Sequence, residues 1–220
     1  MRKMKKVFVT VLSFLVVIGL CVGGIALGHL PFSDLRRKAD CYAGSIEVCH
    51  SQNDQDGDGI DDQSDLLQSA LEYLKTRPHY RSAYYESGYP DDGFGVCTDV
   101  VAFGLLGAGY DLSQLVDEDI RSHPSDYDVP QRDRNIDFRR VRNLLVYFRH
   151  TAEELSEDPL DIEEWQGGDI VIFPGHIGIV SERRNAQGIP YVLHHYSSFQ
   201  WSYEEDILLD REIIGHFRIK

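Results

Sequence analysis

Positive charge and cysteine are both scarce in this chain of 220 residues. It carries 22 lysines and arginines against 36 aspartates and glutamates, a formal net charge of −14. A surface of that sign repels phosphate groups, so we expect no nucleic-acid partner. The chain has four cysteines, and no second cysteine pair accompanies Cys41 and Cys49, which argues against a structural zinc site.

One long apolar run without charge occupies residues 7–28, directly after a basic N-terminus. A run of this length is typical of a membrane span, and basic residues before it favour a cytoplasmic N-terminus. We therefore predict that residues 1–28 are an uncleaved signal anchor that holds the protein in a membrane. The alternative is a cleaved signal peptide with its cleavage site at residues 26–28. In both cases the rest of the chain lies outside the cytoplasm.

Residues 29–65 form the predicted extracytoplasmic linker to a folded domain at residues 66–220. Cys41 and Cys49 lie close together in this polar stretch. Outside the cytoplasm they would form a small-loop disulfide, and two free thiols are the alternative. In both cases Cys97 is left as a free thiol.

An acidic loop at residues 54–65 places oxygen-bearing side chains at alternate positions, then a glycine, then further acidic groups. Calcium takes six to eight oxygen ligands, and a tight turn lets one short loop surround the ion. The stretch resembles thrombospondin type 3 calcium repeats and, more loosely, an EF-hand loop, although an aspartate stands at the last position. A solvated acidic linker is the alternative. The predicted ligands of a structural calcium ion are Asp54, Asp56, Asp58, the Ile60 carbonyl, Asp62 and Asp65.

Three segments have the apolar spacing of helices. We predict a helix at residues 64–74 capped by Ser64, a second at 111–120, and a third at 135–148 capped by Asn135 or Asp137. His123 and His150, near the last two, have no partner that the sequence identifies.

Cys97 stands where a glycine-containing turn gives way to an apolar run of helical character. This pattern predicts that Cys97 lies in the first turn of a helix, whose unpaired N–H groups favour the thiolate. A thiolate is a nucleophile, so Cys97 is the candidate catalytic residue.

Strand-like runs follow residue 165, and they predict an antiparallel meander with the cysteine helix packed on it, a fold of the α+β class. His176 begins one run and His194 ends the next, so the chain offers a base and an orienting group for Cys97. Buried cysteine and core histidines are the alternative reading. The predicted strands cover residues 169–173, 176–180, 191–194 and 212–219.

Three further residues are candidates for substrate binding. Arg139 would clamp a carboxylate, and Asp99 would line the cleft. Tyr89 lies in the tyrosine-rich stretch before Cys97 and would form part of the cleft wall. A solvated arginine face, a helix-dipole aspartate and core aromatic residues are the respective alternatives.

The blocks GYPDDGFGVCTDVV, DRNIDFRRVRNLL, GGDIVIFPGHIGIVS and GHFRI resemble the family of domain of unknown function 1287, over roughly residues 80–219. That family is placed near the NlpC/p60 cysteine peptidases, so the resemblance implies a papain-like fold. It also implies a Cys97 nucleophile, a His176 base and His194 as third residue. Val96 and His195 depart from the patterns of the two groups. Strand alternation lets only one of His194 and His195 face the cleft, and we predict His194.

The resemblance further implies a bacterial cell-envelope hydrolase that cleaves amide or peptide bonds in peptidoglycan through a thioester. Two other functions stay open. One is a thiol acyltransferase or transpeptidase that uses the same thioester. The other is a non-catalytic calcium-dependent binding module. Nothing in the sequence indicates an organic cofactor.

Overall fold

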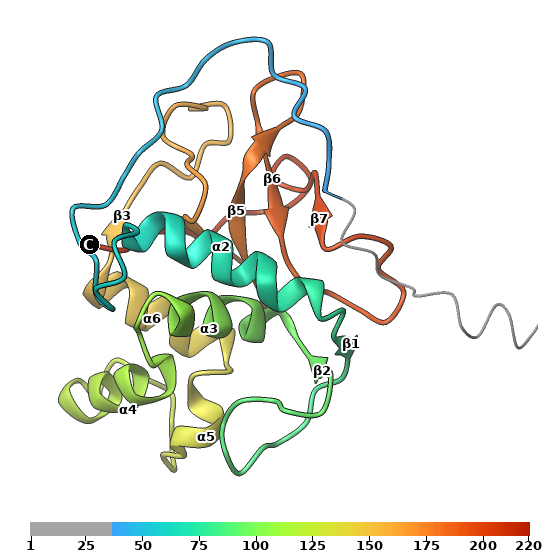
Figure 1. Cartoon of the computed structure of the whole chain (residues 1–220). Helices are drawn as coiled ribbons and strands as arrows, with labels where there is room; N and C mark the ends of the chain where they lie inside the picture. Colours follow the sequence, from blue (N-terminus) through green and yellow to red (C-terminus); the bar gives the residue numbers. More distant parts are fainter. Residues whose placement is uncertain (1–36) are drawn as a thin grey trace, which may run out of the picture. The chain divides into compact units, whose positions relative to one another are not determined.

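The fold contains a six-stranded antiparallel sheet (Figure 1). The computed structural model describes residues 37–220 of the chain. The spatial order is β3-β8-β4-β5-β6-β7. The predicted α+β class and antiparallel sheet are thereby confirmed. The strands are β3 (Glu153–Glu154), β4 (Ile170–Phe173), β5 (His176–Arg184), β6 (Pro190–Leu193), β7 (Glu204–Glu205) and β8 (Gly215–Arg218).

The centre of this sheet is the meander β4-β5-β6, as the sequence predicted. Pro174 and Gly175 form the turn between β4 and β5, and Gly175 takes a φ of +71°, a conformation that favours glycine. The pair Phe173 and His176 closes the hairpin, so His176 is the first residue of β5. The last strand, β8, pairs with β4 and with β3.

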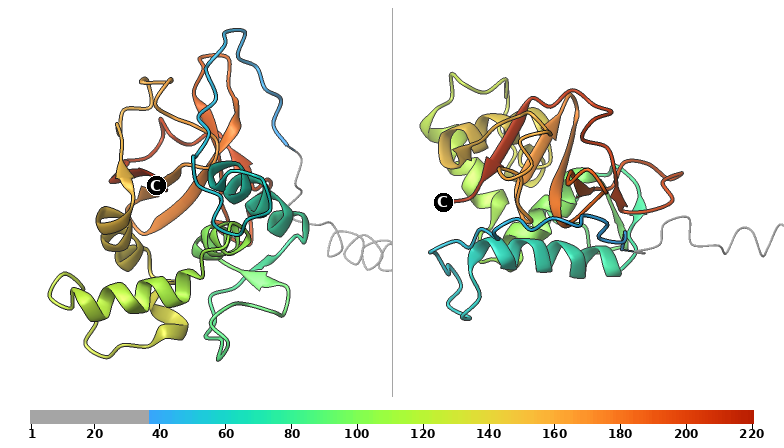
Figure 2. Two further views of the ribbon diagram at one scale, coloured as in Figure 1. Left: turned by 60° about the vertical axis from the view of Figure 1, so that its left-hand side comes forward. Right: turned by 90° about the horizontal axis from the view of Figure 1, so that it is seen from above.

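Helices α2 (Asp62–Lys75) and α3 (Cys97–Gly107) lie side by side on one face of the sheet (Figures 1 and 2). Gly104 is the point of closest approach. A Cβ at this position would lie 3.0 Å from the Leu66 carbonyl oxygen and 3.1 Å from Ile179 Cδ1. A larger residue would separate α3 from both α2 and β5.

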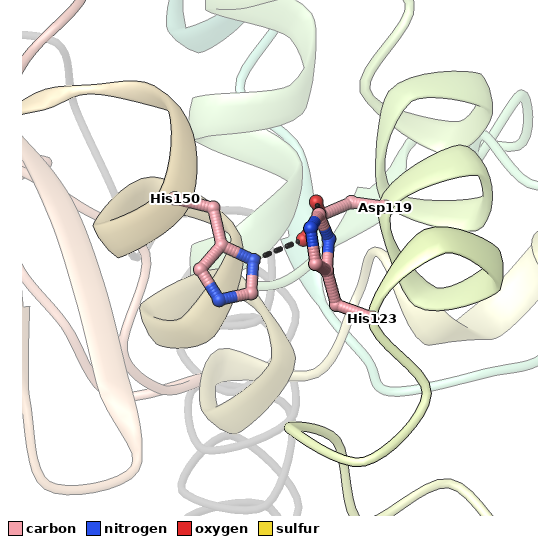
Figure 3. A group of neighbouring side chains, drawn as sticks. All are labelled: Asp119, His123 and His150. Carbon is pink, nitrogen blue, oxygen red and sulfur yellow. Dashed lines mark hydrogen bonds and ion pairs between the residues drawn. The ribbon is translucent and has the colours of Figure 1, made fainter.

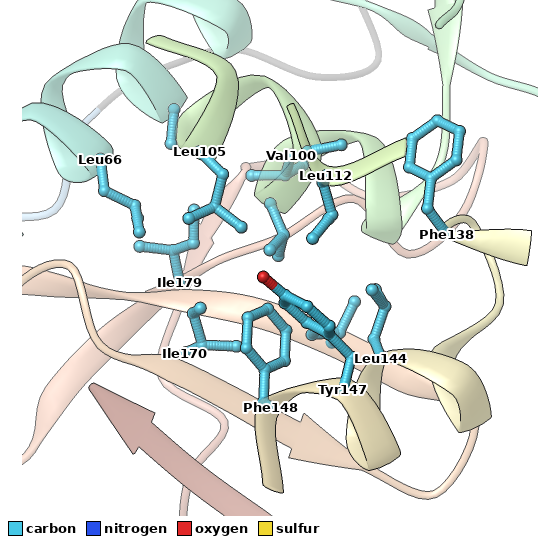
Figure 4. Packing of buried hydrophobic residues seen from close by; sticks show 14 of the residues in the cluster. Leu66, Val100, Leu105, Leu112, Phe138, Leu144, Tyr147, Phe148, Ile170 and Ile179 are labelled. Atoms are coloured by element: carbon cyan, nitrogen blue, oxygen red, sulfur yellow. The ribbon is translucent and has the colours of Figure 1, made fainter. Parts of the chain in front are cut away.

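Apolar side chains of the helices and of the sheet meet in one large core (Figure 4). Leu66, Val100 and Leu105 come from the helices, and Ile170 and Ile179 come from the sheet. A second, smaller cluster covers the opposite face of β4-β5-β6. Its members are Trp165, Val171, Phe173, Val180, Ile189, Val192, Ile207 and Leu208.

The remaining helices differ in part from the sequence pattern. Helix α4 (Leu112–Ser122) matches its prediction, but the helix expected at residues 135–148 is divided into α5 (Arg134–Asp137) and α6 (Val141–Thr151). Asp133, not Asn135 or Asp137, caps α5. Asp61, not Ser64, caps α2, and its side chain accepts the Ser64 N–H. A separate parallel pair joins β1 (His79–Tyr80) to β2 (Phe94–Gly95).

The predicted signal anchor at residues 1–28 and the first part of the linker lie outside the described residues. Within residues 37–220, no helix has both the length and the apolar character that a membrane span requires.

Candidate functional site

Cys97 is the first residue of α3, the position that the sequence predicted. The first N–H groups of a helix have no intrahelical acceptor and form its positive end. The sulfur therefore lies where hydrogen-bond donors are available. Val96, just before the helix, has extended backbone and directs the chain into this turn.

An ion pair between Asp99 and Arg139 holds the beginning of α3. Arg139 Nε donates to Asp99 Oδ1 over 2.7 Å, and its Nη2 donates to Oδ2 over 2.9 Å. Asp99 Oδ2 also accepts the Val96 N–H over 2.7 Å, and Arg139 Nη1 donates to the Ala83 carbonyl over 2.6 Å. The two side chains are 0% and 2% exposed and are occupied by each other, which favours a structural role, and their substrate binding stays a prediction. They support the helix that carries the thiol.

Tyr89 is also a structural residue. Its hydroxyl donates to Asp111 Oδ1 over 3.1 Å, and its ring packs against Phe103 and Phe138. The tyrosine is therefore a partly buried residue packed against the core, and its substrate binding stays a prediction.

His176 begins β5, and the thiol lies at the same end of that strand. The backbone N–H of Ile177, the next residue, favours the thiolate of Cys97, so the sulfur lies near the beginning of β5. Among the hydrogen bonds of residues 37–220, none joins the sulfur to the His176 ring. Cys97 and His176 thus lie at the same end of the sheet without a direct hydrogen bond.

His194 contacts the other side of the imidazole. His176 Nε2 lies 2.9 Å from His194 Nδ1, and both rings are buried. Gly178 makes this contact sterically feasible, because a Cβ there would lie 3.3 Å from His194 Cβ and 2.5 Å from Val192 Cγ1. The two histidines therefore meet across neighbouring strands because the residue between them has no side chain.

Glu205 extends this pair into a chain of three groups. Its Oε2 lies 3.1 Å from His194 Nε2. A carboxylate only accepts hydrogen bonds, so Glu205 favours a proton on His194 Nε2, with Nδ1 as acceptor. The Gln200 amide nitrogen lies 3.3 Å from the same Nε2 but donates to the His194 carbonyl oxygen over 3.1 Å. In this tautomer His176 donates from Nε2, which leaves its Nδ1 unprotonated.

His195 takes no part in the hydrogen bonds that join Glu205, His194 and His176. Its ring lies edge-on to Tyr80 at 5.3 Å and to Tyr203 at 5.2 Å. Its buried Nδ1 has no hydrogen-bond partner in the described part of the chain. Of the two adjacent histidines, it is thus His194 that contacts His176.

Burial disfavours charge on both members of the pair. It raises the pKa of the Cys97 thiol to about 11, although neighbouring backbone N–H groups favour the thiolate. Burial, assisted by His194, lowers the pKa of His176 to about 3. At neutral pH the pair is therefore a thiol and a neutral imidazole. The expected preference for the thiolate is not met, because loss of water outweighs the helix terminus.

Several residues of the site carry no signal in the sequence. The Tyr196 ring lies edge-on to His176 at 5.4 Å, and the Arg211 guanidinium lies over the Tyr196 ring at 4.6 Å. Within residues 37–220 Arg211 has no hydrogen-bond or ion-pair partner. Glu205 belongs to the two-residue strand β7, and Arg211 belongs to a loop. Neither segment is long enough or regular enough for its sequence pattern to predict it. Of these residues, only Tyr196 could have been identified from the sequence, because it directly follows His194 and His195.

The acidic loop brings carboxylates together, as predicted. Asp54, Asp56 and Asp58 each offer an oxygen, and these atoms all lie within 4.8 Å of one another. Gly57 and Gly59 take φ values of +75° and +94°, which turn the loop back on itself. The arrangement resembles a site for a hard cation.

Asp62 and Asp65 belong to α2 and complete the acidic group. The pKa of Asp65 is raised by burial and then by the charges of the other loop carboxylates. Asp62 already uses both oxygens, since Oδ1 accepts the Gln55 N–H over 2.7 Å and Oδ2 accepts the Tyr110 hydroxyl. Ile60 lies in the loop between these groups and donates its N–H to Asp58 Oδ1 over 2.8 Å.

Cys41 and Cys49 are both free thiols in this structure, Cys41 being exposed. The structure therefore has the two free thiols and not the disulfide.

The sequence profile of a domain of unknown function, DUF1287, matches residues 67–219. An uncharacterized protein YijF from Escherichia coli (strain K12) is 36% identical over 168 residues, which cover 70% of this chain and 80% of YijF. No solved structure is significantly similar to the chain.

The raised thiol pKa predicts the charge state of Cys97. With Cys21, Cys41 and Cys49 replaced by serine, the ultraviolet absorption of the Cys97 thiolate is expected to appear only above pH about 8.5, the value for an ordinary cysteine. Thiolate absorption that is already present at neutral pH, and that His176→Ala abolishes, would instead demonstrate an ion pair.

Proposed function

The chain belongs to the DUF1287 family, and from that premise we propose that it is an extracytoplasmic cysteine hydrolase that cleaves amide or peptide bonds. The observation that carries this proposal is the chain from Glu205 through His194 to His176, which ends beside Cys97. A buried core has no need of a fixed imidazole tautomer next to a thiol. A hydrolase has that need, because the base must face the nucleophile.

A relation to the NlpC/p60 cysteine peptidases is part of this proposal. The features in its favour are a cysteine at a helix N-terminus, the helix packed on an antiparallel sheet, and a histidine on the following part of that sheet. The corresponding substrate class is the peptide part of bacterial peptidoglycan. The corresponding location is the cell envelope, with the protein anchored in the membrane through residues 7–28.

The reaction begins with a neutral pair. His176 Nδ1 takes the thiol proton as the Cys97 sulfur attacks the carbonyl carbon, and His194 with Glu205 stabilises the imidazolium. The Cys97 N–H, which has no intrahelical acceptor, donates to the oxyanion. His176 then protonates the leaving amine, and the thioester remains on the sulfur. Water, deprotonated by His176, hydrolyses the thioester and restores the thiol.

Arg211 is the group that selects the substrate in this proposal. Its guanidinium stacks on Tyr196, has no acidic partner within residues 37–220, and lowers the pKa of the nearby His176. A substrate carboxylate would supply the missing partner. Peptides with free carboxylates, as in wall stem peptides, fit this requirement.

Calcium is proposed as a structural ion of the acidic loop. The loop packs against the end of α3, since a Cβ on Gly109 would lie 3.1 Å from Asp56 Cβ. Asp62 and Asp65 connect the same loop to α2. An ion bound there would join the two helices that cover the sheet, at the end of α3 opposite Cys97.

Hydrolysis is tested by incubating the protein with purified peptidoglycan and identifying the fragments by mass spectrometry. We expect new amine and carboxyl ends, and a loss of rate of about 10⁴-fold or more in Cys97→Ala, because the nucleophile is removed. Cys41→Ala, which removes an exposed thiol, is the matched control. Capture of the acyl group by an added amine would show transfer instead, and equal rates for Cys97→Ala and wild type would refute thiol catalysis.

Arg211→Gln is expected to raise KM by roughly 10- to 100-fold for peptides with a free carboxylate, the value of a hydrogen-bonded ion pair of about 1.5–3 kcal/mol. The value of kcat should change little, and the amidated form of the same peptide should show no effect. Arg142→Gln, at an arginine paired with Asp128, serves as the control. An equal loss for both peptide forms would contradict carboxylate recognition.

Asp65→Asn tests the acidic loop. The raised pKa of Asp65 means that its ionisation costs stability once the pH rises above the ordinary carboxylate range near about 4. The substitution should therefore raise the melting temperature without calcium. Saturating calcium should raise that of the wild type by roughly 5–10 °C, the effect of about 2.7 kcal/mol, and that of the variant by much less.

Asp128→Asn, at an aspartate with an 81% exposed side chain, is the control for this experiment. If calcium does not change the melting temperature of the wild type, the loop does not bind calcium and is a solvated acidic linker.

A further inference from the structure

Away from the candidate catalytic site, two histidines converge on one aspartate where the end of α4 meets the end of α6 (Figure 3). His123 Nδ1 lies 2.8 Å from Asp119 Oδ1, and His150 Nδ1 lies 2.7 Å from Asp119 Oδ2. Each residue offers one ligand atom, and these atoms all lie within 4.8 Å of one another. The sequence alone identified no partner for either histidine.

The elements of the fold hold this cluster from several sides. Asp119 and His123 are four positions apart at the end of α4, so they lie on one face of that helix. His150 occupies the last turn of α6. The Tyr127 hydroxyl donates to Asp119 Oδ2, and Asp126 Oδ2 lies 3.4 Å from His150 Nε2. Asp126 thus lies at the Nε2 edge of the His150 ring, away from the Asp119 oxygen that faces Nδ1.

Imidazole nitrogen together with carboxylate oxygen is the ligand set that zinc and similar divalent transition metals prefer. We propose that Asp119, His123 and His150 bind Zn²⁺ or a cation of the same class, with water completing its coordination. Ligand distances near about 2.0–2.2 Å leave room for the ion only if the hydrogen-bonded nitrogen and oxygen atoms, now 2.7 and 2.8 Å apart, move away from each other. The side chains of His123 and His150 are 50% and 25% exposed, so they are free to make this adjustment.

Metal binding replaces the hydrogen bonds within the cluster. Asp119, whose side chain is 10% exposed, accepts from both histidines and from Tyr127. On binding, the ring nitrogens that donate to Asp119 give up those hydrogen bonds and face the ion instead. The bound ion ties α4 to α6 and fixes the loop between residues 123 and 133.

The experiment is a titration of the full chain, free of any histidine tag and stripped of metal with chelator, with Co²⁺ followed by Zn²⁺. We expect one Co²⁺ per chain with visible d–d absorption of a nitrogen-ligated ion, and its loss when Zn²⁺ displaces it. His123→Gln and His150→Gln should each weaken binding at least about tenfold, the lower range for altered metal surroundings. His50→Gln, at a histidine paired with a single aspartate, should bind like the wild type.

Circular dichroism of each variant confirms that it is folded, and Asp119→Asn gives an independent test of the carboxylate. Absence of the cobalt absorption in the wild type would overturn the proposal. So would wild-type binding in His123→Gln and His150→Gln, because the ion would then lie elsewhere, for example in the acidic loop.

Discussion

The close packing of α3 on β5 decides where the functional groups of this molecule lie. Gly104 lets the helix approach to within contact of Ile179 on the strand and of the α2 backbone. The beginnings of α3 and β5 lie at the same end of the sheet, because the N–H of Ile177, the second residue of β5, favours the thiolate of Cys97. The ion pair between Asp99 and Arg139 then fixes the beginning of the helix. Chemistry at this edge is a consequence of how two apolar elements pack.

Burial and hydrogen bonding act in different directions at the site. Loss of water keeps the thiol protonated and the imidazole neutral, whereas the helix terminus and the Ile177 N–H favour negative charge on sulfur. The Cys97 thiol and the His176 imidazole are therefore both neutral, and what matters for proton transfer between them is which His176 nitrogen is unprotonated. Glu205 sets this through His194, since an acceptor at one end of the chain determines which nitrogen carries each proton.

The sequence predicted those features of the fold that depend on local periodicity. The meander and the position of Cys97 in the first helical turn follow from spacing. Strand alternation lets only one of His194 and His195 face the cleft without saying which, and His194 is the one that contacts His176. It did not predict the roles of Arg139 and Tyr89, because their partners lie far away in the chain and burial cannot be read from residue type. Glu205 and Arg211 were missed for the opposite reason: their segments have no regular pattern, and only tertiary packing brings them to His176. The partnership of His123 with His150 also depends on how α4 meets α6.

The central claim is that Glu205 and His194 set the tautomer of His176 so that Nδ1 faces the thiol as a base. Long-range ¹H–¹⁵N NMR of the imidazole nitrogens tests it directly, with His176→Gln and His194→Gln used to assign the signals. The account predicts a neutral His176 protonated on Nε2 with a bare Nδ1, and His194 protonated on Nε2, at neutral pH. A His176 that carries its proton on Nδ1, or that is doubly protonated, would contradict the account.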